Sequence, residues 1–199
     1  MTPLDCRAAL LVVDMQKGFD DPAWGARNNP RAEAHVAMLL QAWRDAAARV
    51  IHVHHCSSSP TGRFRPGTAG SRVKPQALPA AGELLYYKWT NSAFIGTSLE
   101  ADLQQRQIGT LVVVGLTTNH CISTTVRMAG NLGFRTYVVA DATATFDRAG
   151  ADGRMRPAED VHNAALGDLA GEFAEVVDAR SVIRAMAPQS GRVTRRRAR

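Results

Sequence analysis

The segment Gly115-Leu116-Thr117-Thr118-Asn119-His120-Cys121 joins an apolar, β-branched run at 110–114 to a stretch with helical periodicity at 122–132. The run predicts a buried parallel strand, and the periodic stretch predicts a helix whose first turn contains Cys121. Unpaired N–H groups and the positive end of the helix dipole favour a thiolate at such a position. We therefore expect Cys121 to have a lowered pKa and to act as a nucleophile. The alternative is a small, buried apolar residue.

Five further short apolar runs predict strands, and helical patterns alternate with them along the chain. The runs span 8–13, 50–54, 83–87, 134–140 and 174–177. Helices are expected from Pro30, Thr97, Ile122, Pro157 and Ser181. Strands that alternate with helices predict an α/β fold with three α/β/α layers, doubly wound around a six-stranded parallel sheet.

Size and charge indicate one globular domain followed by a basic tail. The chain has 199 residues, of which 45% are apolar, and this is ample for one core, so we place the domain at 1–187. The formal net charge is +6, but the last eight residues carry five arginines, so 6 − 5 leaves +1 for the rest. We expect 188–199 to be a disordered, Arg-rich tail, and neither nucleic acid nor a membrane to be the main partner.

The cysteines indicate the cellular compartment of the protein. Cysteines stand at positions 6, 56 and 121, an odd number at no metal-like spacing. With no leader pattern at the N-terminus and no apolar run of ~20 residues, they predict a cytoplasmic protein in a reducing compartment.

The Pro/Gly/Ser-rich passage at 55–82 is long for a compact domain, which indicates a lid or a pocket wall.

Three reactive side chains follow three of the predicted strands. Asp14 ends the first apolar run, Lys88 ends the third, and Cys121 lies just past the fourth. Parallel strands bring their carboxyl ends to one edge of the sheet, where open α/β sheets bind ligands. A base, a cation and a thiol at this edge are the groups that nucleophilic catalysis requires.

These residues belong to three blocks of sequence. The blocks are Leu11-Val-Val-Asp-Met-Gln16 with Phe19, Lys88 with Asn91-Ser-Ala-Phe94, and Gly115 to Cys121 with Thr124. Their order and spacing resemble the signature blocks of the isochorismatase-like cysteine hydrolases, and the similarity covers roughly residues 7–184. The resemblance implies the isochorismatase-like hydrolase fold, a homodimer or homotetramer, and an Asp-Lys-Cys triad that hydrolyses amide-type C–N bonds of small molecules through a thioester. We expect no cofactor.

The resemblance also implies a role for individual residues. Cys121 attacks the carbonyl carbon, Asp14 accepts the thiol proton and later passes it to the leaving nitrogen, and Lys88 balances the charge. The family has a non-proline cis peptide bond at the position that is Leu116–Thr117 here. The amide N–H groups of Thr117 and Cys121 then form the oxyanion hole, where loss of one donor typically costs ~10²–10³ in rate.

A metal site is not expected. Nicotinamidases of this family bind a metal through an Asp-x-His pair after the second strand, and His55 and Ser57 hold those two positions here. His52 and His54 share one face of the predicted strand, but no third ligand follows at a useful spacing. We interpret these histidines as polar residues beside the pocket, and nicotinamidase activity is disfavoured.

The substrate class follows from the cysteine and from a finer resemblance. True isochorismatases cleave a vinyl ether without relying on the cysteine, so an intact triad favours acyl chemistry. The blocks 65–70, 91–97 and 128–134 resemble the subgroup of streptothricin hydrolase, which opens the lactam of an antibiotic. We expect cleavage of an amide, a ureide or a lactam, including the streptothricin lactam, with another ureide or carbamoyl amidohydrolase as the alternative.

Seven residues are candidates for the substrate pocket because of their positions beside the three blocks. They are Phe19, Trp24, His55, Asn91, Phe94, His120 and Phe146.

Functions of two other classes are alternatives to hydrolysis. A nucleotide-binding oxidoreductase is disfavoured because no Gly-x-Gly-x-x-Gly turn follows the first strand at 14–18. A non-enzymatic thiol sensor or binding protein would use Cys121 without needing Asp14 and Lys88.

Overall fold

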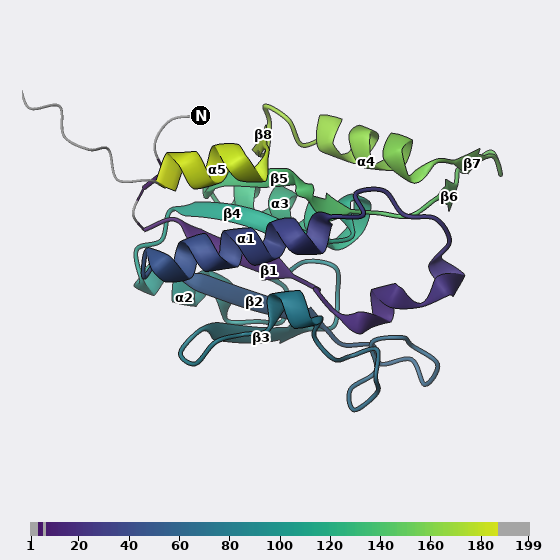
Figure 1. Cartoon of the computed structure of the whole chain (residues 1–199), viewed down its shortest axis with the longest axis horizontal. Helices are drawn as coiled ribbons and strands as arrows, with labels where there is room; N and C mark the ends of the chain where they lie inside the picture. The colour runs from purple at the N-terminus through teal and green to yellow at the C-terminus, as the bar shows by residue number, and fades with distance from the viewer. Residues whose placement is uncertain (1–3, 6, 187–199) are drawn as a thin grey trace, which may run out of the picture.

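The computed structural model describes residues 4, 5 and 7–186 and confirms the α/β fold (Figure 1). The predicted domain end at 187 and the predicted tail at 188–199 lie outside the described residues. At the centre is a six-stranded, entirely parallel sheet that contains all six predicted strands. In sheet order these are β3 (Leu84–Lys88), β2 (Val50–His55), β1 (Ala9–Val13), β4 (Thr110–Leu116), β5 (Arg135–Ala144) and β8 (Glu175–Val177).

The order of the strands reverses between β1 and β4, which lie side by side in the sheet. From β1 the chain runs outward through β2 to β3, then returns to β4 and continues to β5 and β8. Gly115 of β4 pairs with Val13 at a φ of +120°, and a Cβ there would lie 1.9 Å from the Val13 carbonyl oxygen. Glycine therefore allows β1 and β4 to end close together, at the switch in strand order where ligand sites form.

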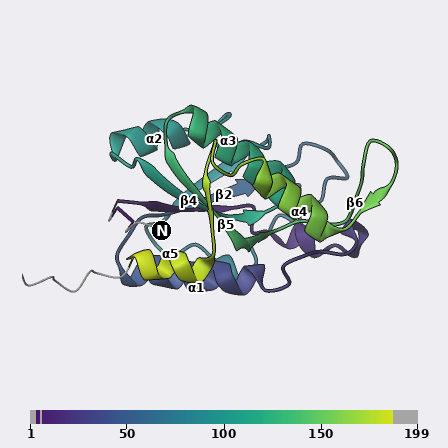
Figure 2. The same cartoon turned by 90° about the horizontal axis from the view of Figure 1, so that it is seen from above.

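Helices cover both faces of the sheet (Figure 2). One face carries α1 (Ala32–Asp45) and α5 (Ala179–Met186), and the other carries α2 (Leu99–Gln105), α3 (Ser123–Asn131) and α4 (Ala158–Gly167). The predicted helix starts lie within two residues of these bounds. Among the described residues, no helix is both long enough and apolar enough to cross a membrane.

The central strands are buried on both sides, which explains their unbroken apolar sequences. In β1, Leu10 and Val12 belong to the core under α1 and α5, whereas Leu11 and Val13 belong to the core under α2 and α3. The two cores fix the register of β1, because a slip by one residue would exchange their side chains.

One segment differs from the prediction. Cys121 lies in a π-helical turn, Thr118–Ile122, from which α3 continues, and not in the first turn of an α-helix. Apolar periodicity over so few residues does not distinguish a π-turn from an α-turn. After β5, an exposed antiparallel hairpin of β6 (Arg148–Ala149) and β7 (Met155–Arg156) leads to α4.

The long passage at 55–82 is fastened to the segment after β1. The Gln16 side chain donates to the carbonyls of His55 and Ser71, both at 3.0 Å, and accepts from the N–H of His55 at 2.8 Å. Three backbone hydrogen bonds then join the neighbours of Gln16 to residues 70–74. The passage therefore lies beside the end of β1, and it continues into the 3₁₀ turn Pro75–Ala77.

Candidate active site

Asp14, Lys88 and Cys121 come together at the carboxyl edge of the sheet. The Lys88 ammonium nitrogen lies 2.7 Å from Oδ2 of Asp14 and 3.2 Å from Sγ of Cys121. Asp14 and Lys88 are fully buried, and Cys121 is 7% exposed. Asp14 adopts a left-handed φ of +53° directly after β1, a conformation that aspartate tolerates better than most residues. The predicted convergence of base, cation and thiol is therefore present in the structure.

The Lys88 ammonium lies among four possible acceptors. Besides Asp14 and Cys121 it contacts the carbonyl oxygen of Thr90 at 3.2 Å and Nδ1 of His55 at 3.4 Å. Asp14, His55 and Cys121 offer metal-type donor atoms within 4.8 Å of one another. Because Lys88 contacts all three of these residues, its ammonium group supplies the positive charge that a metal ion would otherwise bring to this donor set.

The proton on Cys121 is held more tightly than predicted. Burial and the negative charge of Asp14 raise the pKa of the Cys121 thiol to about 12. The predicted lowering of this pKa is therefore wrong for the resting site, because desolvation and a nearby carboxylate outweigh the backbone N–H groups of the turn and the Lys88 charge. Cys121 therefore rests as a thiol at pH 7, and it would need a base in order to act as a nucleophile.

Asp14 has the properties of such a base. Burial raises its pKa above the ordinary value, although the Lys88 ammonium opposes this shift. Oδ2 accepts from Lys88, whereas Oδ1 is buried with no hydrogen-bond partner among the described residues. One carboxylate oxygen is thus held in place while the other remains able to accept a proton. The Cys121 thiol in turn lies 3.7 Å from Oδ1 of Asn91, which accepts from it.

The peptide bond between Leu116 and Thr117 is cis. It lies at the end of β4, immediately before the π-turn, so Thr117 and Cys121 belong to one continuous segment around the nucleophile. The N–H groups of His120 and Ile122 both donate to the carbonyl of Thr117, at 3.1 and 3.2 Å. These bonds fix the carbonyl of Thr117 inside the turn.

Three of the predicted pocket residues form one aromatic cluster. Phe19 lies 5.5 Å from Trp24 and 6.2 Å from Phe146, measured between ring centroids. Phe64, which the sequence did not single out, completes the cluster at 4.7 Å from Phe19 and meets the edge of His55 at 5.6 Å. Since His55 contacts Lys88, the aromatic cluster is connected through His55 to the group formed by Asp14, Lys88 and Cys121. Its signal in the sequence is only an aromatic residue within the long loop.

The remaining pocket candidates are placed differently. Asn91 contacts the Cys121 sulfur as described above, and His55 contacts Lys88. Phe94 stacks on Phe134 at 5.9 Å within the core under α2 and α3, apart from the aromatic cluster. His120 is half-buried, and burial together with the Arg148 charge lowers its pKa, so it is neutral at pH 7.

His52 and His54 belong to a different environment from His55. Nε2 of His52 is 2.8 Å from Oε2 of Glu83, and Arg44 of α1 binds the same carboxylate. The His54 ring meets the edge of Tyr87 at 5.9 Å. These two histidines therefore point to the α1 face, while His55 points to the triad, and the three do not gather around one metal-sized space.

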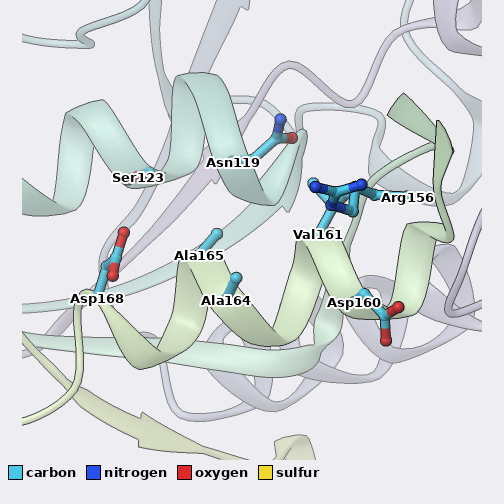
Figure 3. A pocket seen from close by; sticks show the side chains of 8 residues that line it. All are labelled: Asn119, Ser123, Arg156, Asp160, Val161, Ala164, Ala165 and Asp168. Atoms are coloured by element: carbon cyan, nitrogen blue, oxygen red, sulfur yellow. The ribbon is translucent and has the colours of Figure 1, made fainter. Parts of the chain in front are cut away.

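A hollow of about 490 Å³ lies behind the nucleophile's turn, between α4 and the start of α3 (Figure 3). Asn119 and Ser123, on either side of Cys121 in the sequence, form one wall, and Val161 and Ala165 of α4 form the other. The triad does not line this hollow. It marks the junction between the turn and α4.

The sequence and the structure are similar to those of known proteins. The Isochorismatase domain model matches residues 8–181. The isochorismatase family protein YrdC of Bacillus subtilis is 43% identical over 171 residues, which are 86% of this chain and 91% of YrdC. A crystal structure of an isochorismatase family protein from Chromobacterium violaceum has a TM-score of 0.90 and 44% identity, covering 93% of this chain and 97% of that one.

Relatives that are named for an activity are less similar. Nicotinamidase 3 of Arabidopsis thaliana is 33% identical over 184 residues, covering 86% of this chain and 84% of that enzyme. Maleamate amidohydrolase of Pseudomonas putida is 29% identical over 189 residues, covering 86% and 83%. Streptothricin hydrolase of Streptomyces noursei is 32% identical over 139 residues, which are 70% of this chain and 50% of that enzyme.

Proposed function

This chain belongs to the isochorismatase family, and we propose that it is a cysteine-dependent amidohydrolase that cleaves a C–N bond through a thioester on Cys121. One observation carries the proposal: Lys88 contacts both Asp14 and Cys121 within 3.2 Å in a buried site. A base, a cation and a thiol in contact are what an activated cysteine nucleophile needs. The names of the nicotinamidase and maleamate amidohydrolase relatives support a C–N bond as the target.

Acylation begins with proton transfer from the Cys121 thiol to Asp14. Oδ1 takes the proton as the sulfur forms a bond to the substrate carbonyl carbon, and the π electrons of the C=O bond move to the oxygen, which becomes an oxyanion. The Lys88 ammonium stabilises the negative charge that develops on the sulfur before this bond is complete. The tetrahedral intermediate then collapses and the C–N bond breaks. Asp14 returns the proton to the nitrogen, so that a neutral amine or ammonia leaves and a thioester remains.

Deacylation repeats these steps with water. Asp14 takes a proton from the water molecule while the oxygen of that water attacks the thioester carbon. The C–S bond then breaks. The proton passes back to the sulfur, which leaves a carboxylic acid product and the resting thiol. The raised pKa of Cys121 favours this last step, because the sulfur regains its proton readily.

The oxyanion that forms in both steps needs hydrogen-bond donors. We assign this role to the amide N–H groups of Thr117, which follows the cis peptide bond, and of Cys121, which lies within the π-turn. Backbone donors suit this task because the surrounding structure holds them in place before the reaction begins.

The substrate is proposed to be a small amide, ureide or lactam with an apolar acyl portion. The cluster of Phe19, Trp24, Phe64 and Phe146 provides an aromatic surface that reaches the triad through His55. The streptothricin lactam remains one candidate. It is supported by the similarity to streptothricin hydrolase, which spans 50% of the length of that enzyme. We further propose that the protein is cytoplasmic and forms homodimers or homotetramers; light scattering tests the assembly.

A substrate panel tests the proposal. Primary amides, ureides and lactams, including a streptothricin, are incubated with the wild type and with Cys121→Ala, and amine or ammonia release is measured. The proposal requires release with the wild type at a rate at least ~10³-fold above the variant, since removal of a covalent nucleophile abolishes its pathway. Cys56→Ala, which alters the other described cysteine, is the matched control and should retain the wild-type rate.

A further inference from the structure

The back of the nucleophile's turn is bonded to α4 through a buried histidine. Oγ1 of Thr118 and Nδ1 of His162 are 2.8 Å apart, and both side chains are almost completely buried. Thr118 opens the π-turn that contains Cys121, whereas His162 lies in the middle of α4. This is a direct side-chain bond between the turn and another element.

Asn29 packs against the far side of the His162 ring. The Asn29 amide nitrogen donates to the carbonyls of Ala140 and Thr143 at 2.9 and 2.7 Å, so the orientation of the amide is fixed. The same nitrogen faces Nε2 of His162 at 3.4 Å. Because an amide nitrogen cannot accept, Nε2 has no acceptor on this side. The hydrogen bond of the ring to the turn is therefore the one between Nδ1 and the Thr118 hydroxyl.

This arrangement holds only while His162 is neutral. A second ring proton would place an N–H group of His162 against the amide N–H groups of Asn29. Burial lowers the pKa of His162, and this shift outweighs the opposing effect of Glu159 on the same helix.

Other titratable groups lie on the elements around His162. On the π-turn, His120 is neutral at pH 7. On β5, Oδ2 of Asp141 lies 3.2 Å from Nδ1 of His35 of α1. After β5, Asp147 accepts from the N–H of Ala158 at the start of α4.

The surroundings of His162 place α4 firmly against the end of β5. Asn28 accepts from the N–H of Thr145 at 2.8 Å and donates to Glu159 of α4 at 3.3 Å. Figure 3 shows the outer side of the same junction, where Val161 and Ala165, on either side of His162 in position, face the residues that flank Cys121. α4 is thus the support against which the nucleophile's turn rests.

We propose that His162 is a positioning residue that holds the π-turn through Thr118 and so keeps the Cys121 sulfur aligned with Asp14 and Lys88. The inference rests on the proposed function for its kinetic consequence. It extends that function because neither residue touches the reacting atoms. A displacement of ~1 Å at the nucleophile is enough to reduce the rate by ~10².

A double-mutant cycle on the full chain tests the pair. His162→Phe keeps the ring volume but removes the ring nitrogens, and Thr118→Val removes the hydroxyl; we expect either to lower kcat by ~10²-fold with little change in KM. The double variant should lose no more than either single one. His162→Asn, whose side-chain amide can form a hydrogen bond with the Thr118 hydroxyl, should recover at least a tenth of the wild-type kcat.

The acid limb of the pH profile separates positioning from simple stabilisation. Protonation of His162 should add to the loss of wild-type kcat at low pH, and this part of the loss should be absent from His162→Asn, which does not titrate. Equal losses of melting temperature in the variants with unchanged kcat and an unchanged pH profile would overturn the inference.

A substrate-independent measurement keeps this test apart from that of the proposed function. Alkylation of Cys121 by iodoacetamide, followed by mass spectrometry, should change in rate by at least threefold in both single variants and by no more in the double variant. If no amide is hydrolysed but these rates are coupled, the positioning inference stands while the proposed function fails. If amides are hydrolysed and the two substitutions act additively on kcat and on alkylation, the positioning inference is wrong.

Discussion

Lys88 reaches from β3 past His55 of β2 to place its ammonium nitrogen 2.7 Å from Oδ2 of Asp14, with both side chains fully buried. Such a pair is costly to bury, and removal of one partner strongly destabilises the folded protein. The same ammonium contacts the Cys121 sulfur at 3.2 Å. The pair therefore sets the electrostatics of the Cys121 thiol as well as the structure of the site.

Asp14→Asn should abolish turnover while the fold is retained. With the pKa of Cys121 at about 12, almost no thiolate exists at pH 7 without a base. We expect the rate of amine release to fall by at least ~10³-fold, with unchanged circular dichroism. Asp45→Asn, at the exposed end of α1, is the control. Turnover of Asp14→Asn at a tenth of the wild-type rate or more would remove Asp14 from the mechanism.

The same substitution should make Cys121 more reactive toward a small alkylating agent. The negative charge of Asp14 contributes to the raised pKa of the thiol, so its removal lowers that pKa and increases the thiolate fraction. In a Cys56→Ser background, the pH at which iodoacetamide reacts at half its maximal rate should move downward. An upward shift would mean that Asp14 does not raise the thiol pKa.

Lys88→Met should have two measurable effects. It leaves the Asp14 carboxylate buried without its partner, so the pKa of Asp14 should rise further and unfolding should become easier by ~3–5 kcal/mol. Urea unfolding measures the second effect, with Lys17→Met, an exposed lysine, as the control. If kcat and the unfolding midpoint both match the wild type, the ion pair has no role in either property.

As the pH is lowered, activity should begin to fall at a higher pH than it would if Asp14 had the pKa of an ordinary aspartate. Burial raises the pKa of Asp14 above 3.8, and the protonated acid cannot accept the thiol proton. The rate of amine release should therefore fall as the pH drops through this raised value. A profile that remains flat down to pH 4 would contradict this role for Asp14.

Glu33 should make stability depend on pH in acid. Its pKa is about 2 in the folded protein because Arg27 and Lys74 bind its carboxylate against the cost of burial, whereas the ordinary value is 4.5. The lowered pKa contributes stability that is fully present above pH 4.5 and is lost as the pH falls toward 2. Urea unfolding at pH 6 and pH 3 should show a smaller difference for Glu33→Gln than for the wild type. Equal differences would contradict the assignment.

The sequence predicted the sheet and the triad because both depend on local signals. Each strand is an apolar run of its own, and Asp14 and Lys88 end two of these runs, so topology alone brings them to one edge. The pKa of Cys121 could not be predicted in this way. It depends on how deeply the thiol is buried and how near the carboxylate lies, and these are properties of packing.

His162 and Phe64 show where sequence reasoning ends. His162 looks like any polar residue on an amphipathic helix, and its role depends on contacts with Thr118 and Asn29, which are 44 and 133 positions away. Phe64 lies in a loop without periodicity, so nothing local indicates that it packs on Phe19. Long-range contacts of this kind leave no pattern in a single sequence.

Intact-mass spectrometry of the protein during turnover tests the central claim most directly. With a substrate found in the panel, the wild type should show a transient mass increase equal to the acyl portion, located on Cys121 by peptide mapping and matched by released amine. Asp14→Asn should show no such adduct. Two results would contradict the thioester mechanism. One is turnover by the wild type with no adduct on Cys121 under conditions in which the acyl-enzyme should accumulate. The other is turnover that is retained in Cys121→Ala.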